Sequence, residues 1–208
     1  MPFKAVAFDL DGTLVTEKSS WWKLHEYFGT KGQSIENMQK YELGKITYDK
    51  FMRLDIELWQ PRPKKETIEK VLSNYNLTPN SSSVIKTLIE REYSIFIVTT
   101  APDLFANAVA KELNVKNIAS NGFTFDEEGF LNSNAIFNVD LINKDQAFAK
   151  MLSNFGIQCE ECIAVGDSKY DCGFLNKAGL GLAFKPDDVL RGKAKFVIDD
   201  MREILSFI

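Results

Sequence analysis

Three short apolar segments, each followed at once by polar side chains, constrain the fold of this chain most. The segments and the residues that follow them are 4–8 with Asp9, 94–98 with Thr99-Thr100, and 161–165 with Gly166-Asp167. A continuous apolar run of this length is typical of a strand buried inside a parallel sheet. Helical patterns lie between the runs, and strands that alternate with helices form a parallel sheet covered on both faces. We therefore expect an α/β fold with a doubly wound, Rossmann-like core.

The remaining elements follow from the same patterns. Apolar runs predict two further strands at 180–184 and 195–198. Apolar residues at helical spacing predict helices at 81–92, 103–113, 144–155, 170–178 and 201–207. Aromatic and apolar residues on both sides of Asp126-Glu-Glu-Gly129 predict a β-hairpin within 122–137, at the margin of the sheet.

Residues 17–75 interrupt the alternation, because this stretch has helical patterns and no convincing strand. The predicted helices are 20–28, 35–43, 48–59 and 64–75. We therefore expect a catalytic core formed by 1–15 and 77–208, with a small helical cap domain at 16–76 inserted after the first strand. Such a cap would have its own small core, close over the strand ends, exclude water and select the substrate.

Composition and charge restrict the class of partner. Hydrophobic residues make up 45% of the chain and charged residues 26%, as in soluble globular proteins. The net charge of −4 provides no basic surface, so we expect no nucleic-acid partner. No apolar run approaches the roughly 18 residues that span a bilayer, and the acidic N-terminal segment excludes a signal peptide. We expect a cytoplasmic protein without membrane association, of unknown oligomeric state, with Cys159 and Cys162 as ordinary reduced thiols.

Asp9-Leu-Asp-Gly-Thr13 is the most informative stretch for chemistry. Two carboxylates two residues apart repel each other unless a cation lies between them or one is protonated. A carboxylate can attack phosphorus, and oxygen-liganded Mg²⁺ can screen it from an anionic phosphate. Alone, the motif would also fit a solvated acidic turn. However, Asp167 and Asp171 follow another strand, Thr99 follows a third, and Lys144 opens a helix. Together they predict a nucleophile, an acid/base, a metal site and phosphate ligands at one sheet edge.

Four motifs in this order resemble those of the haloacid dehalogenase superfamily of phosphatases. They are Asp9-Leu-Asp-Gly-Thr13, Val98-Thr99, Lys144, and Gly166-Asp167 with Asp171. The resemblance covers essentially the whole chain. It is strongest to the phosphoserine phosphatase branch, because Asn176–Phe184 and Met201–Leu205 look like the C-terminal third of that branch, and the helical insertion matches its cap.

The resemblance implies a Mg²⁺-dependent phosphatase that hydrolyses a small-molecule phosphate monoester through a phospho-aspartyl intermediate. Asp9 would be the nucleophile and a metal ligand, and Asp11 the general acid and then the base, with its carbonyl on the metal. Asp167 would be the second carboxylate ligand, and Asp171 an outer ligand or an orienting group. The phosphoryl oxygens would be held by Thr99, Thr100, Lys144 and the backbone near Leu10.

The chain departs from the phosphoserine branch at positions that concern the substrate. It has Gly12 where that branch usually has Ser, Thr99-Thr100-Ala101 in place of Ser-Gly-Gly, and Ser168 and Tyr170 in place of Gly and Asn. The branch's glutamate for the substrate ammonium falls on Lys18, and its arginine for the substrate carboxylate falls on Asp55, with Arg53 as an alternative. We therefore predict that phosphoserine is a poor substrate, and that Trp21 and Trp22 are further candidates for substrate selection.

Three alternatives stay open at this point. A phosphotransferase or phosphomutase of the same superfamily would use the same residues. A dehalogenase would need neither Asp11 nor a metal. A non-catalytic regulatory protein would only bind Mg²⁺ and phosphate, and would not need an acid/base two residues from the nucleophile.

Overall fold

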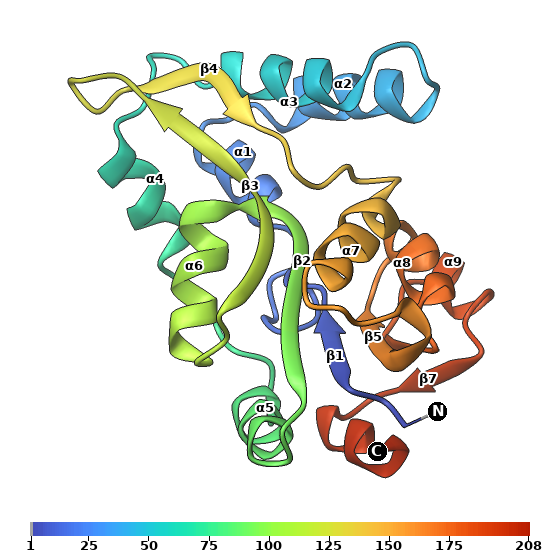
Figure 1. Ribbon diagram of the computed structural model, residues 1–208. Helices are drawn as coiled ribbons and strands as arrows, with labels where there is room; N and C mark the ends of the chain where they lie inside the picture. Colours follow the sequence, from blue (N-terminus) through green and yellow to red (C-terminus); the bar gives the residue numbers. More distant parts are fainter. Residues whose placement is uncertain (1) are drawn as a thin grey trace.

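A seven-stranded sheet forms the centre of the structure, a computed structural model that describes residues 2–208 (Figure 1). The strands are β1 (Ala5–Phe8), β2 (Ser94–Pro102), β3 (Asn117–Phe125), β4 (Leu131–Ile136), β5 (Cys162–Gly166), β6 (Leu180–Phe184) and β7 (Phe196–Ile198). Their order is β4-β3-β2-β1-β5-β6-β7, and β4 is antiparallel to β3 whereas all other neighbours are parallel. The predicted α/β fold class is confirmed.

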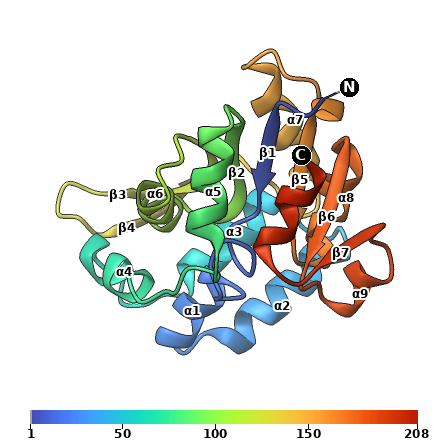
Figure 2. The same ribbon diagram turned by 90° about the horizontal axis from the view of Figure 1, so that it is seen from below.

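Helices cover both faces of this sheet, as Figures 1 and 2 show. One face carries α5 (Ser81–Glu90), α6 (Asp103–Glu112) and the C-terminal 3₁₀ helix η3 (Met201–Phe207); the other carries α7 (Lys144–Ser153), α8 (Cys172–Lys177) and the short α9 (Asp188–Arg191). Side chains of a strand alternate between faces, so Val6 and Phe8 pack with the first set and Ala5 and Ala7 with the second. The central strand is therefore buried on both sides.

Four helices between β1 and α5 lie near the carboxyl ends of the strands (Figure 1). They are α1 (Ser20–Tyr27), α2 (Lys31–Glu42), α3 (Tyr48–Glu57) and α4 (Lys65–Leu72). The Ser19 and Thr47 side chains cap the N-termini of α1 and α3 by accepting from backbone N–H groups. Gly29 and Gly44, both at φ +67°, follow α1 and α2 in the left-handed conformation that ends helices.

These helices share their apolar contacts with the rest of the protein. Leu24, Trp59 and Ile68 belong to the main core cluster. A separate cluster contains Tyr41, Tyr48, Phe51 and Met52, and Phe137 and Leu141 from outside the helices pack against it. The expected separate core at 16–76 is thus only partly present, because one side of the helical segment packs directly on the sheet layer.

The β3–β4 hairpin begins where the sequence predicted it, with Gly122 opposite Ile136 and a turn closed by Asp126, whose Oδ1 accepts from Phe130 N. The first half of β3 was not predicted, and it pairs in parallel with β2. The far strand β4 packs against α3. Across residues 2–208, no helix is both long and apolar enough to cross a membrane.

Candidate active site

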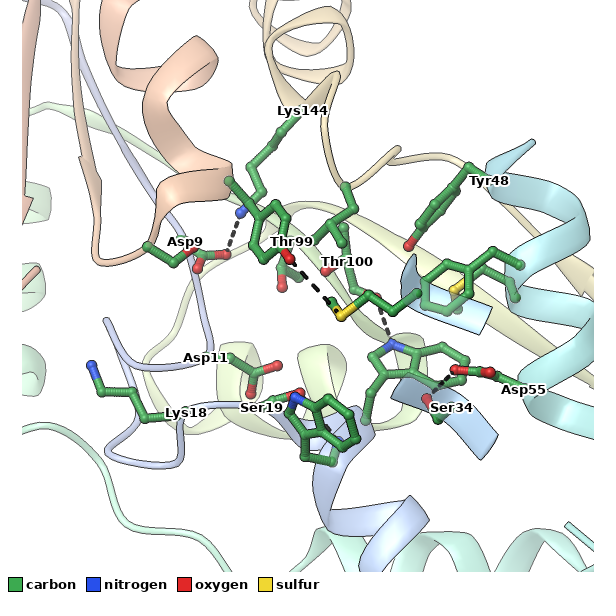
Figure 3. Close-up of a pocket in the computed structure, with 18 of the residues that line it drawn as sticks. Asp9, Asp11, Lys18, Ser19, Ser34, Tyr48, Asp55, Thr99, Thr100 and Lys144 are labelled. Atoms are coloured by element: carbon green, nitrogen blue, oxygen red, sulfur yellow. Dashed lines mark hydrogen bonds and ion pairs between the residues drawn. The ribbon is translucent and has the colours of Figure 1, made fainter. Parts of the chain in front are cut away.

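The predicted motifs meet at the carboxyl ends of β1, β2 and β5 (Figure 3). Asp9 follows β1 and Asp167 follows β5, and each side chain is buried. Carboxylate oxygens of Asp9, Asp167 and Asp171 lie within 4.8 Å of one another. The parallel register of β1 with β5, which pairs Phe8 with Val165, places these strand ends side by side. The arrangement is the oxygen-rich site that the sequence predicted.

Lys144, the first residue of α7, places its ammonium between two of these carboxylates. Its Nζ donates to Asp9 Oδ1 at 2.9 Å and to Asp171 Oδ1 at 2.6 Å, and the side chain is buried. The other oxygen of Asp171 accepts from the backbone N–H groups of Asp167 and Ser168 and from the Ser168 hydroxyl. Both oxygens of Asp171 are therefore engaged, and this residue orients Lys144 and the 166–168 loop.

Burial dominates the protonation of this cluster. Burial raises the pKa of Asp9 well above its ordinary value. The Lys144 ammonium acts to lower this pKa, and the carboxylates of Asp171 and Asp167 act to raise it further. Burial also raises the pKa of Asp167 to about 6, although a hydrogen bond from Lys18 acts in the opposite direction. Burial alone would lower the pKa of Lys144, but the carboxylates of Asp171 and Asp9 outweigh it and raise this pKa. The negative charge of the cluster is thus unfavourable without additional cationic charge.

Asp11 has one oxygen held in place and one without a partner. Its Oδ2 accepts from the Ser20 backbone N–H at 3.0 Å and from the Ser20 hydroxyl at 2.7 Å. Its Oδ1 is buried and, among residues 2–208, has no hydrogen-bond partner. Burial raises the pKa of Asp11 to about 6 despite the two hydrogen bonds, which favour the ionised form. A carboxyl group with this pKa can both give and take a proton near neutral pH.

Thr99, Thr100 and Leu10 lie around the same strand ends. The Thr99 hydroxyl is buried and accepts from Ala101 N at 3.0 Å, which leaves its proton available to a ligand. Thr100 lines the cavity, and its carbonyl accepts from the Trp21 indole N–H at 3.0 Å. The Leu10 side chain is buried in the main core, so only its backbone amide is available for a phosphate contact.

Gly12 occupies a position that no larger residue can take without rearrangement. Its φ is +75°, which favours glycine, and a Cβ atom there would lie 2.2 Å from Asp167 Oδ2. Gly12 therefore allows Asp167 to approach the first motif closely.

A cavity of about 160 Å³ opens from the carboxylate cluster towards the helices α1–α3. Its wall is mainly aromatic and apolar, formed by Trp21, Trp22, Met38, Tyr48, Phe51, Met52, Leu141 and Tyr170. Asp55 and Ser34 lie at the side of the cavity opposite Asp9 and Lys144 (Figure 3). The cavity therefore has an ionic end and an aromatic end.

The structure places four of the five predicted substrate-selecting residues at the cavity. Trp21, Trp22, Asp55 and Lys18 line the cavity. Lys18 is 66% exposed and its Nζ lies 2.6 Å from Asp167 Oδ2, so it faces the carboxylate cluster.

The structure does not place Arg53, the alternative to Asp55, at the cavity. Its guanidinium instead donates to Asp49 and to Asn134 of β4, outside the cavity. Successive residues of a helix differ by about 100° in direction, so Arg53 points away from the side of α3 on which Asp55 lies.

Several residues at the site were not predicted. Ser20, which holds Asp11, is the second serine of the pair Ser19-Ser20, a recognisable helix-start signal. Ser34 and the wall residues of α2 and α3, which are Met38, Tyr48, Phe51 and Met52, could not be identified, because helical spacing alone does not show which side of these helices faces the cavity. Glu42 at the end of α2 accepts from Lys169 Nζ at 2.7 Å and from the Tyr170 hydroxyl at 2.6 Å, and thereby joins α2 to the loop after β5.

Comparisons with known proteins agree with this architecture. The family model of haloacid dehalogenase-like hydrolases matches residues 3–179. A phosphoserine phosphatase of Methanocaldococcus jannaschii is 28% identical, with 99% of this chain and 97% of the relative covered. A phosphoserine phosphatase of Archaeoglobus fulgidus is 24% identical over 92% of this chain, which spans about half (55%) of that relative. A solved structure described as a phospho-aspartyl intermediate analogue of phosphoserine phosphatase superposes with a TM-score of 0.82 at 26% identity, with both chains fully covered.

These matches confirm the predicted resemblance and the predicted enzyme class, a phosphoric monoester hydrolase. The match to the family model includes β1, β2 and β5 together with Lys144, so it contains every strand end that contributes to the carboxylate cluster. On this basis the chain belongs to the haloacid dehalogenase-like hydrolases.

Proposed function

We propose that this protein is a Mg²⁺-dependent phosphatase that hydrolyses a small-molecule phosphate monoester through a phospho-aspartyl intermediate on Asp9. The observation that carries the proposal is the cluster of Asp9, Asp167 and Asp171 around the buried ammonium of Lys144. The relatives named phosphoserine phosphatase support the same chemistry. We further propose that residues 1–15 and 77–208 act as the catalytic core, and that 16–76 act as a cap that closes the cavity.

The donor set of the cluster suits Mg²⁺. All its ligand atoms are carboxylate oxygens, which hard divalent cations prefer. Four carboxylates, those of Asp9, Asp11, Asp167 and Asp171, are accompanied by the two ammonium groups of Lys18 and Lys144. Two negative charges remain when all are ionised, and a divalent cation neutralises them. Asp9, Asp167 and the Asp11 carbonyl would hold the ion, and when bound it would reduce the repulsion between the nucleophile and the phosphate.

In the proposed reaction, the free oxygen of Asp9 attacks phosphorus and the alcohol leaves. Lys144 holds Asp9 through Oδ1 and carries a positive charge that stabilises the developing charge on the phosphoryl oxygens. The Thr99 hydroxyl and the backbone amide of Leu10 would donate to these oxygens. Asp171 keeps Lys144 in position, which is the orienting role expected for it.

Asp11 would supply the proton for the leaving oxygen and later remove one from the attacking water. The two hydrogen bonds from Ser20 fix Oδ2, so the partnerless Oδ1 is the atom that exchanges the proton. Asp11 also argues against a purely phosphate-binding role, because binding alone needs no acid/base at this position.

Removal of the divalent cation is expected to abolish hydrolysis. We expect p-nitrophenyl phosphate to be hydrolysed with Mg²⁺ and release of phosphate to fall by at least about a hundredfold in EDTA, because the buried carboxylates then repel the phosphate. The measurement is phosphate release with and without Mg²⁺, with restoration by added Mg²⁺ as the control. Equal rates in both conditions would exclude the metal, and absence of release in both would exclude the phosphatase.

We expect phosphoserine to be a poor substrate. The lysines of the cavity, Lys18 and Lys144, lie at the ionic end and are engaged by carboxylates, while Asp55 at the other end would repel the substrate carboxylate. An unpaired or mismatched charge in a closed site costs roughly 2–5 kcal/mol, and each 1.4 kcal/mol is about tenfold. Measurement of kcat/KM should place phosphoserine about thirtyfold or more below the preferred substrate in a panel of sugar, polyol, nucleotide and amino-alcohol phosphates. Phosphoserine as the best of the panel would contradict this expectation.

A further inference from the structure

A buried carboxylate faces the aromatic end of the cavity. Asp55 is 2% exposed and lies across the cavity from Asp9 and Lys144 (Figure 3). Its oxygens accept from Ser34 Oγ at 2.6 Å, Asn37 Nδ2 at 2.8 Å and His25 Nε2 at 3.1 Å. The two oxygens of Asp55 therefore face three polar partners inside the protein, and a carboxylate oxygen accepts hydrogen bonds.

His25 contacts Asp55 through Nε2, and two other side chains contact its Nδ1. The Trp59 indole N–H donates to His25 Nδ1 at 3.2 Å, and the Thr30 hydroxyl lies 2.8 Å from the same nitrogen. A ring nitrogen that accepts a hydrogen bond carries no proton, so the proton of His25 is on Nε2 and points to Asp55. Among residues 2–208, no lysine or arginine nitrogen lies within 4.0 Å of Asp55, and a buried charge without a counter-ion is costly.

Aromatic rings and thioethers fill the wall between this carboxylate and the phosphate end. Trp21, Trp22, Tyr48 and Phe51 line the cavity, with Met38 and Met52 beside them. The hydrogen bond from the Trp21 indole to Thr100 O fixes one of these rings. The faces of aromatic rings attract cations, and quaternary ammonium groups in particular. The wall therefore suits a cationic group better than a sugar or a polyol. A sugar or a polyol would need hydrogen-bond partners, and Ser34 and Asp55 already use most of their hydrogen-bonding capacity with each other and their neighbours.

We propose that this end of the cavity recognises a cationic nitrogen, and that the substrate is the phosphate monoester of an amino alcohol that has no carboxylate. The inference rests on the proposed function, because the phosphate must lie at Asp9 for the nitrogen to reach the aromatic wall. Asp55 supplies the counter-charge, and the rings of Trp21, Trp22, Tyr48 and Phe51 supply the contact surface. A methylated nitrogen suits the wall best, because it needs ring faces rather than hydrogen-bond acceptors.

Two phosphate esters of the same shape test this proposal. Phosphocholine and 3,3-dimethylbutyl phosphate differ in the charge of one atom, nitrogen in the first and carbon in the second. We expect kcat/KM for phosphocholine to exceed that for the neutral ester by about tenfold or more in the wild-type protein. Asp55→Asn should reduce this ratio at least severalfold. The control Glu57→Gln removes an exposed carboxylate from the same helix, α3, and should leave the ratio unchanged.

A binding measurement separates the proposal from the proposed phosphatase activity. Calorimetry on the Asp9→Asn variant with Mg²⁺ compares the affinities for the two esters without turnover, and the same preference for phosphocholine is expected. Equal affinities, or a preference that Asp55→Asn leaves unchanged, would overturn the cationic site even if p-nitrophenyl phosphate is hydrolysed. If Asp55→Asn does not fold, Trp22→Leu removes a ring face instead and should lower the ratio. Loss of p-nitrophenyl phosphate hydrolysis with retained preference would overturn only the phosphatase.

Discussion

Asp9→Asn is expected to reduce phosphate release by at least about a thousandfold, because it removes the attacking oxyanion. The amide preserves the size of the side chain and can still meet Lys144, which keeps its 2.6 Å contact with Asp171. The measurement is steady-state hydrolysis of p-nitrophenyl phosphate with saturating Mg²⁺. Residual turnover above about one part in a thousand would contradict a covalent intermediate on this residue.

The stability of the same variant distinguishes loss of chemistry from loss of fold. Burial raises the pKa of Asp9, so the folded protein holds the ionised form of this side chain at a cost in folding free energy. Removal of that charge should therefore leave Tm unchanged or raise it. Asp188→Asn, an exposed position in α9, provides a matched control in which both activity and Tm should stay at the wild-type level. A large fall in Tm for Asp9→Asn would mean that activity was lost through unfolding.

Parts of the fold that depend on continuous apolar runs could be predicted from sequence. β6 spans 180–184 as expected, and β1 and β5 differ by one residue at their ends. The first half of β3 was not predicted, because it is interrupted by polar residues such as Asn121. That side chain is buried and finds its partners in the Tyr48 hydroxyl and in the backbone of Val139, far away in sequence. A strand that buries polar side chains against distant partners has no apolar pattern to recognise.

The candidate site also has a part that could be predicted from the sequence and a part that could not. Asp9, Thr99 and Asp167 could be placed together from the sequence, because the carboxyl ends of parallel strands lie at the same edge of a sheet, independently of the loop conformations. The opposite side of the cavity depends on how α1–α3 are rotated about their axes. Asp55 and Arg53 are two residues apart on α3, yet one lines the cavity and the other contacts β4. Positions in a helix that packs on two sides cannot be assigned from spacing alone, because both sides carry apolar residues.

Asp11→Asn is expected to separate the two halves of the reaction. With p-nitrophenyl phosphate, whose leaving group needs no proton, the variant should still form the phospho-aspartyl intermediate on Asp9. Hydrolysis of that intermediate should slow by about 10²–10⁴-fold, the usual contribution of a general base. The asparagine amide retains the size of the side chain, and its oxygen can still accept from Ser20, so the difference concerns proton transfer and not position.

Rapid quench with a ³²P-labelled aryl phosphate measures the accumulation of the phospho-aspartyl intermediate directly, as acid-stable label on the protein. The matched control is Ser20→Ala, which keeps the Asp11 carboxylate but removes the hydroxyl that donates to Oδ2 at 2.7 Å. This control should lower the steady-state rate by a smaller factor and accumulate little label, because the base is present but less well oriented. Absence of label in Asp11→Asn together with a wild-type steady-state rate would exclude Asp11 as the acid/base. Equal accumulation of label in both variants would instead mean that the orientation of the Asp11 carboxylate limits hydrolysis of the intermediate. Ser20→Ala changes that orientation but leaves the proton-accepting atom of Asp11, Oδ1, unchanged.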